Sequence, residues 1–179
     1  MPETAKAVMP DPMAKWSPVP DWTTATIDRA GWSARPVFGL SIAFVGGYVA
    51  AALAALAPDM QVLGLWQIAA GPDYAIRIAR DRALIVTREP LTFKTGWDTG
   101  GWSVTEAESA YGVIDLSGEA LADIVSEATA ADIETGSRSA SVLFAGVPCL
   151  LIRMSETTAR LHMEIGYMPY LWRWLETRS

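Results

Sequence analysis

Hydrophobic residues follow two different periods between residues 37 and 179. Apolar runs and strict alternations of apolar with polar residues predict strands, whereas apolar residues three or four apart predict helices. The predicted strands are Leu40–Val45, Gln61–Ile68, Tyr74–Ala79, Ala83–Thr87, Tyr111–Leu116, Ala140–Phe144, Cys149–Met154 and Arg160–Ile165. The predicted helices are Tyr48–Leu56, Ser103–Ala110, one with Leu121, Ile124, Val125 and Ala128 on one side, and a closing helix with Pro169 near its start. Together these elements predict an α+β fold.

The predicted elements repeat in order. Strand, helix, three strands and helix occur over residues 37–110 and again over residues 111–179, and Phe38-Gly39 and Tyr111-Gly112 begin the two series. Such internal repetition is typical of a duplicated architecture. We therefore predict a single domain, residues 37–179, made of two duplicated β-α-β3-α units with antiparallel or mixed sheets.

Two serines are placed to cap helices. Ser103 stands three residues before Glu106, which is the spacing of a capping box. Ser117 directly precedes the helix that follows Tyr111–Leu116, and its hydroxyl is expected to accept a hydrogen bond from a backbone amide of the first turn.

The strand Arg160–Ile165 alternates apolar and polar residues. This pattern predicts a half-buried strand whose two faces meet the core and the solvent. The core face would carry Leu161, Met163 and Ile165, and the solvent face Arg160, His162 and Glu164.

The closing helix carries several aromatic residues. Its apolar stripe is expected to contain Tyr170, Leu171, Trp174 and Leu175. Trp172 lies off this stripe and either packs locally or contacts a partner, since tryptophan is enriched among interface anchors.

The first 36 residues differ in composition from the rest of the chain. They combine many prolines, which exclude a continuous helix or a central strand, with Trp16, Trp22 and Trp32. We predict an extended arm, residues 1–36, that lays its tryptophans on another surface, either of this domain or of another subunit. The candidates for a partner interface along the whole chain are Trp16, Trp22, Trp32, Trp97, Trp102 and Trp172.

The segment Phe38–Ala57 has no charged residue over a length that could span a bilayer. Its glycines and alanines make it weakly apolar, and Gly46-Gly47 divides it into a strand pattern and a helix pattern. We favour a strand, a turn and a buried helix over a membrane anchor.

Charge and composition exclude several classes of function. The net charge of −6 argues against nucleic-acid binding, which needs clustered lysine and arginine. The single cysteine, Cys149, excludes an internal disulfide and a cysteine-based zinc site. One cysteine and the absence of asparagine, hence of N-glycosylation sequons, fit a reducing cytoplasm.

No catalytic or metal-binding motif stands out. The glycine-rich loop Gly96–Gly101 lacks the Lys-Ser/Thr of a phosphate loop and is interpreted as a turn or a partner-contact loop. His162, the only histidine, is accompanied by no nucleophile elbow and is expected to face solvent or an interface. We assign no catalytic residue and no metal ligand.

A family resemblance rests on the order of several short motifs from Gly71 onward. These are Ile78-Ala79-Arg80-Asp81-Arg82-Ala83-Leu84-Ile85-Val86, Val113-Ile114-Asp115-Leu116-Ser117-Gly118, Ala131-Asp132-Ile133, Gly146-Val147-Pro148 with Leu151-Ile152-Arg153, and Tyr170-Leu171-Trp172-Arg173-Trp174-Leu175. In this order they resemble the gamma subunit of heterotetrameric sarcosine oxidase and related N-methyl amino acid oxidoreductases. The chain departs from the family pattern at Asp132-Ile133-Glu134 and at Gly166-Tyr167.

The resemblance implies a fold similar to the folate-binding domain of the glycine-cleavage aminomethyltransferase. It also implies that FAD, FMN, NAD and tetrahydrofolate are bound by larger flavoprotein subunits and not by this chain. The leading hypothesis is therefore a non-catalytic subunit of a flavin-dependent, N-demethylating oxidase or dehydrogenase.

Two alternatives remain. One is a stand-alone folate-binding or one-carbon transfer protein, in which Asp115 at a strand end would hold the pterin ring; a local role of Asp115 in a turn or cap is the simpler interpretation. The other is a membrane-anchored assembly factor that uses Phe38–Ala57.

Overall fold

The structure is a computed structural model that describes residues 19–179. Trp16 and the first half of the predicted arm lie outside the described residues. The strands of sheet A are β1 (Ile27–Arg29), β2 (Trp32–Pro36), β9 (Tyr111–Ser117), β10 (Ser141–Phe144), β11 (Val147–Ser155) and β12 (Thr158–Glu164). Those of sheet B are β3 (Ser41–Gly47), β4 (Val62–Leu63), β5 (Tyr74–Ala79), β6 (Arg82–Thr87), β7 (Gly96–Asp98) and β8 (Trp102–Glu106). The helices are α1 (Val49–Leu56), α2 (Leu121–Ala128), the short 3-10 helix η1 (Ile165–Tyr167) and α3 (Met168–Glu176).

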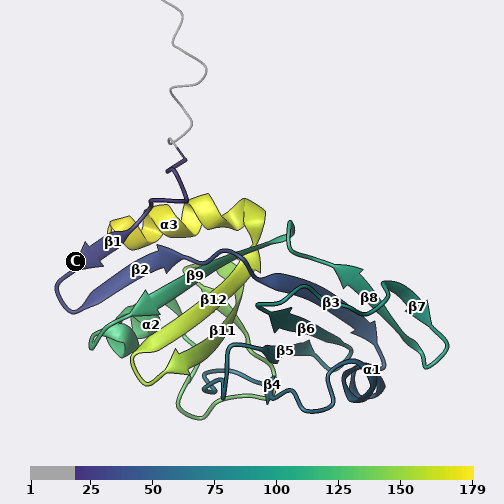
Figure 1. The fold of residues 1–179 in the computed structure, drawn as a ribbon. Coiled ribbons are helices and arrows are strands. Elements are labelled where there is room, and N and C mark those ends of the chain that lie inside the picture. The colour runs from purple at the N-terminus through teal and green to yellow at the C-terminus, as the bar shows by residue number, and fades with distance from the viewer. Residues whose placement is uncertain (1–18) are drawn as a thin grey trace, which may run out of the picture.

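The two sheets have matching strand orders (Figure 1). Sheet A runs β1-β2-β9-β12-β11-β10, and sheet B, taken from its other edge, runs β7-β8-β3-β6-β5-β4. In each sheet a hairpin lies beside the strand that leads into a helix. Neighbouring strands are antiparallel except for β4 and β5, which are parallel. The fold is therefore a mixed α+β arrangement of antiparallel and mixed sheets.

The molecule has four layers, which follow from its three apolar clusters. One cluster joins the outer face of sheet A to α2 and α3. A second lies between the sheets and includes Tyr74 and Leu84 from sheet B with Val113 and Ile152 from sheet A. A third packs α1 onto the outer face of sheet B. Each sheet is thus covered on both faces, so most residues of its central strands are buried.

Most predicted elements of residues 37–179 are present. Tyr74–Ala79 is a strand with the predicted bounds, and α2 buries Leu121, Ile124, Val125 and Ala128 as expected. The division of Phe38–Ala57 into a strand and a helix is confirmed. No helix of residues 19–179 has the length and apolar character needed to cross a membrane.

The helix predicted over Ser103–Ala110 is wrong. Residues Trp102–Glu106 form β8, which pairs with β3, and Trp102 and Val104 are buried with the strand period of two. The capping-box pattern therefore has no helix to cap here.

The arm predicted over residues 1–36 is also wrong for its last ten residues. Ile27–Pro36 form the β1–β2 hairpin, whose second strand pairs with β9 inside sheet A. Trp32 is buried there, and its indole nitrogen donates to the carbonyl oxygen of Ser179 at 3.4 Å. Arg29 binds the carbonyl oxygens of Glu176 and Arg178 at the end of α3. The hairpin therefore ties the start of the described chain to its end.

Candidate functional site

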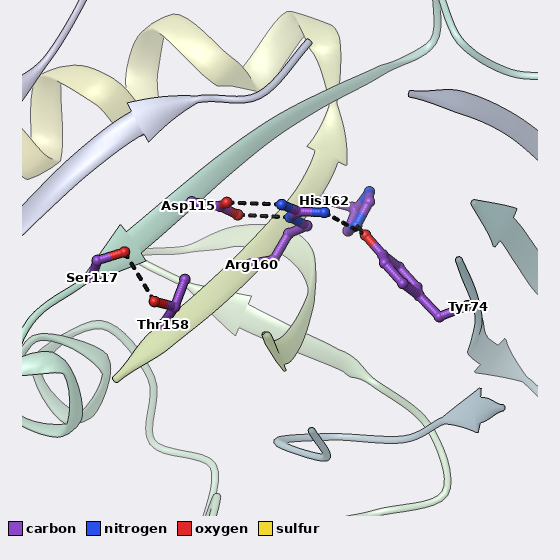
Figure 2. A network of polar contacts seen from close by, with 6 residues as sticks. All are labelled: Tyr74, Asp115, Ser117, Thr158, Arg160 and His162. Atoms are coloured by element: carbon purple, nitrogen blue, oxygen red, sulfur yellow. Dashed lines mark hydrogen bonds and ion pairs between the residues drawn. The ribbon is translucent and has the colours of Figure 1, made fainter. Parts of the chain in front are cut away.

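A polar network crosses the layer between the two sheets (Figure 2). Asp115 on β9 and Arg160 on β12 are directly paired across neighbouring strands. The Arg160 guanidinium donates to both carboxylate oxygens of Asp115, from Nε to Oδ1 at 2.7 Å and from Nη2 to Oδ2 at 2.8 Å. Its Nη1 donates to the hydroxyl of Tyr74, which comes from β5 of sheet B, at 3.1 Å. The Tyr74 hydroxyl lies 3.2 Å from Nε2 of His162.

One ring nitrogen of His162 is unpaired. The Tyr74 oxygen can accept from Arg160 and from Nε2 of His162 at once, so either Tyr74 or His162 can be the donor in the bond between them. Among residues 19–179, Nδ1 of His162 has no hydrogen-bond partner. The network therefore ends in a buried ring nitrogen without a partner.

Burial decides the charges in the network. Burial, and then the charge of Arg160, lower the pKa of His162 to about 3, so the ring is neutral. Burial also raises the pKa of Tyr74. Burial alone would lower the pKa of Arg160, but hydrogen bonds and charge interactions with Asp115 and Tyr74 outweigh it and raise the pKa. One bidentate ion pair and two neutral rings therefore fill this part of the layer.

The predicted solvent face of β12 is wrong. Arg160 is 5% exposed and His162 is 0% exposed, because sheet B covers the face of β12 that the alternation assigned to water. Glu164, at the end of the strand, is exposed as predicted.

Asp115 is engaged by Arg160 through both carboxylate oxygens, and its side chain is 23% exposed. The predicted local role in a turn or cap is replaced by this ion pair between strands. A pterin contact at Asp115 would have to displace or share Arg160, and it stays a prediction. Ser117, the predicted helix cap, lies in β9 instead, 3.2 Å from the hydroxyl of Thr158, and α2 has no side-chain cap.

A hollow of about 310 Å³ adjoins the network, with His162, Cys149, Phe44 and Tyr111 among its lining residues. Burial raises the pKa of the Cys149 thiol to about 12, so it stays protonated near neutral pH. A neutral imidazole with a strongly lowered pKa is a weak general base at this pH. The hollow is therefore better suited to bind a small molecule than to catalyse a reaction of that molecule. Within residues 19–179 no three or more His, Cys, Asp or Glu side chains gather as a metal site.

The predicted interface tryptophans have different surroundings. Trp32, Trp102 and Trp172 are buried in this chain's own clusters, whereas Trp97 on β7 is 74% exposed. The half-buried Trp22 stands edge-on to Trp172, with ring centroids 5.6 Å apart. A partner contact at any of these positions stays a prediction, and Trp97 offers the most free surface for one.

Trp172 belongs to the apolar stripe of α3, contrary to the sequence pattern. The buried residues of α3 are Met168, Leu171, Trp172 and Leu175. Tyr170 is exposed and its hydroxyl donates to the carbonyl oxygen of Ala145. The stripe begins with Met168, which the predicted stripe did not include.

Sequence reasoning missed Tyr74, which joins the two sheets through the network. It lies 86 residues from Arg160 along the chain, so no local pattern connects them. The usable signal was a tyrosine in an otherwise apolar strand, since a buried tyrosine hydroxyl usually has a hydrogen-bond partner.

Comparison with known proteins adds one finding. No protein-family model matches the chain, and no curated protein matches it in sequence. Among solved structures, a chain of the heterotetrameric sarcosine oxidase from Corynebacterium sp. U-96, in complex with pyrrole 2-carboxylate, is similar with a TM-score of 0.64 and 19% sequence identity. The match covers 81% of this chain and 82% of that chain. The two chains share a fold. They are also of similar length, because nearly the same fraction of each is matched.

Proposed function

We propose that this chain is a non-catalytic small subunit, of the gamma type, in a multisubunit flavin-dependent oxidoreductase that demethylates N-methyl amino acids, as sarcosine oxidase does. Its work would be to stabilise and organise larger flavoprotein subunits in the cytoplasm. FAD, FMN, NAD and tetrahydrofolate would be bound by those subunits.

The main support for the proposal is structural similarity to a chain of a heterotetrameric sarcosine oxidase. The shared fold extends over most of both chains. Their similar length supports a small subunit as the counterpart. The short sequence motifs that resemble the same family are a separate line of support, because they depend on residue identity and not on backbone geometry.

The chemistry of the inter-sheet layer also supports a non-catalytic role. Asp115 and Arg160 satisfy each other, and the Tyr74 hydroxyl links Arg160 to His162. The groups that remain, a neutral imidazole and a protonated thiol, do not form an activated nucleophile with its base. The hydrogen bonds of Tyr74 to Arg160 and His162 instead connect the two sheets.

We further propose that the two halves are a duplication. The matching strand orders of the two sheets support this. The repeating unit is then a hairpin, a strand, a helix and three strands, and each hairpin pairs with the sheet of the other half. This unit replaces the predicted order, which placed a helix at Ser103–Ala110.

Co-expression with candidate large flavoprotein subunits from the same genome tests the proposed function. We expect the tagged chain to co-purify with them as one species in size-exclusion chromatography, with the absorbance of bound flavin. A chain that stays monomeric and elutes apart from those subunits would refute the proposal.

A folate-binding protein is the second candidate, and the hollow beside His162 is the observation that favours it. Nδ1 of His162, which has no hydrogen-bond partner among residues 19–179, would pair with a polar atom of a ligand there. Titration with tetrahydrofolate, monitored by tryptophan fluorescence, tests this candidate, with His162→Gln as the comparison. The absence of quenching in the wild-type chain would dismiss it.

A further inference from the structure

An apolar groove lies around Tyr111, where β9 begins and where η1 follows β12. It consists of two hollows of about 340 and 420 Å³ that both have Tyr111 and Ile165 in their walls. Residues of the β2–β3 connection line the first hollow, and residues at the end of β8 line the second. We name this surface the Tyr111 groove.

Large apolar side chains at this end of the molecule are open to solvent. Phe38 is 59% exposed and Ile165 is 48% exposed, and both line the groove. Tyr167, the last residue of η1, is 42% exposed. Contiguous apolar surface of this kind, rimmed by polar residues, marks an interaction site in soluble proteins.

The charged side chains in the groove are all acidic. Glu108 lines the first hollow, and Glu106 and Glu164 line the second. Among residues 19–179, no lysine or arginine lines either hollow, and none of the three carboxylates forms an ion pair. The charge of Glu164 adds to the effect of burial in raising the pKa of Tyr111. The groove is therefore an apolar surface with a negatively charged rim.

We propose that the Tyr111 groove binds an apolar segment flanked by lysine or arginine residues, contributed by a large subunit of the oxidoreductase complex. This inference rests on the proposed function. Charge complementarity selects the occupant, because a basic flank pairs with the three carboxylates and an apolar centre covers Phe38 and Ile165.

The charges of the chain itself disfavour the other occupants. A second copy would bring a net charge of −6 to an acidic rim. The side chains of residues 1–18 include two lysines and two acidic residues, so their charges cancel. A basic segment of a different polypeptide fits the groove better than either.

Charge reversal in the full complex tests the inference. The groove variant is Glu106→Lys/Glu108→Lys/Glu164→Lys, and the control variant is Glu119→Lys/Asp123→Lys/Glu134→Lys, which makes the same change in net charge at positions outside the groove. Each is co-expressed with the large subunits, and the amount of large subunit recovered per tagged chain is measured at low and high salt. Thermal unfolding of each isolated chain verifies that both variants fold.

We expect the groove variant to recover about tenfold less large subunit than wild type, a loss of about 1.4 kcal/mol in binding, while the control variant stays near wild type. High salt should weaken the wild-type interaction. Equal recovery by the groove and control variants would overturn the inference and leave the proposed function standing. If the wild-type chain itself recovers no large subunit, the proposed function fails and the inference fails with it.

A second variant keeps the test independent of charge. Ile165→Ser alters the wall that the two hollows share, and Leu143→Ser is the matched control at an exposed position of β10, outside the groove. Loss of recovery with Ile165→Ser alone supports the groove, and equal recovery with both variants contradicts it.

Discussion

Gly118 lies so close to Gly31 that a β-carbon on Gly118 would overlap the carbonyl oxygen of Gly31. Gly118 connects β9 to α2 with a φ of 138°, and Gly31 forms the turn of the β1–β2 hairpin. The same carbonyl oxygen accepts a hydrogen bond from the backbone amide of Ala120 at 3.0 Å. The N-terminal hairpin is thus attached to the start of α2 through backbone atoms.

Sheet B contains the same arrangement. Gly47, which connects β3 to α1, lies against the carbonyl group of Gly101 in the β7–β8 turn, and the amide of Tyr48 donates to that carbonyl at 2.9 Å. Two hairpins are therefore held in the same way at the starts of two helices, as expected if the halves are a duplication.

Replacing Gly118 by alanine should lower the free energy of unfolding by roughly 2–5 kcal/mol, because a positive φ and an overlap with backbone atoms act together. Gly146→Ala is the matched control: Gly146 also has a positive φ, 81°, but no atom lies near the added carbon. The control should cost only about 1–2 kcal/mol. Denaturant unfolding measures both, and equal losses would contradict the close contact at Gly31.

Removing one partner of the ion pair between Asp115 and Arg160 should destabilise the protein more than removing both. Arg160→Leu leaves a largely buried carboxylate without its partner and should cost roughly 2–4 kcal/mol, a range reduced for the partial exposure of Asp115. The double variant Asp115→Leu/Arg160→Leu should recover much of this loss. Unfolding of the single and double variants forms a double-mutant cycle. Losses that simply add would show that the two side chains do not interact.

The buried His162 should make stability depend on pH. Its pKa is about 3 in the folded chain and that of an exposed histidine, about 6.5, when unfolded. Between these values the unfolded state binds the extra proton, so stability falls as the pH is lowered from 6.5 toward 3, by up to about 1.4 kcal/mol per pH unit. The loss begins near pH 6.5, and stability above that pH is unaffected by this group.

The comparison of wild type with His162→Gln isolates this effect, because the chain has one histidine. The unfolding free energy of wild type minus that of His162→Gln should fall by up to about 1.4 kcal/mol for each pH unit between pH 6.5 and 4.5. A difference that is constant with pH would mean that His162 is accessible to protons in the folded chain.

Replacement by alanine should lower the free energy of unfolding much more at Trp172 than at Trp97. Trp172→Ala removes a buried ring from the cluster beneath α3 and should cost roughly 3–5 kcal/mol. Trp97→Ala removes an exposed ring and should alter the free energy of unfolding by no more than about 0.5 kcal/mol. Thermal unfolding compares the two. Similar losses would contradict the difference in burial, while weaker recovery of the large subunits with Trp97→Ala would support the predicted partner contact.

Local patterns in the sequence predicted most elements because helix and strand periods are properties of short segments. The bounds of β5 and the buried side of α2 follow from such patterns. β8 does not: Ser103-Val104-Thr105-Glu106 carries a helix-capping pattern, but pairing with β3 places it in a sheet. A pattern of four residues does not determine the secondary structure of a segment when that segment can pair with a strand far away in the chain.

Local sequence patterns specify most of the strands and helices of residues 37–179, and short motifs carry the resemblance to one family of multisubunit oxidases. No recognisable catalytic motif is found among them. Which polar residues are buried depends instead on how the two sheets pack against each other. The alternation of β12 specifies two faces, and a second sheet, built from residues 41–106, covers the face that would otherwise meet water. Arg160 and His162 are therefore inside the protein because of contacts with residues far away in the chain, which no local pattern contains.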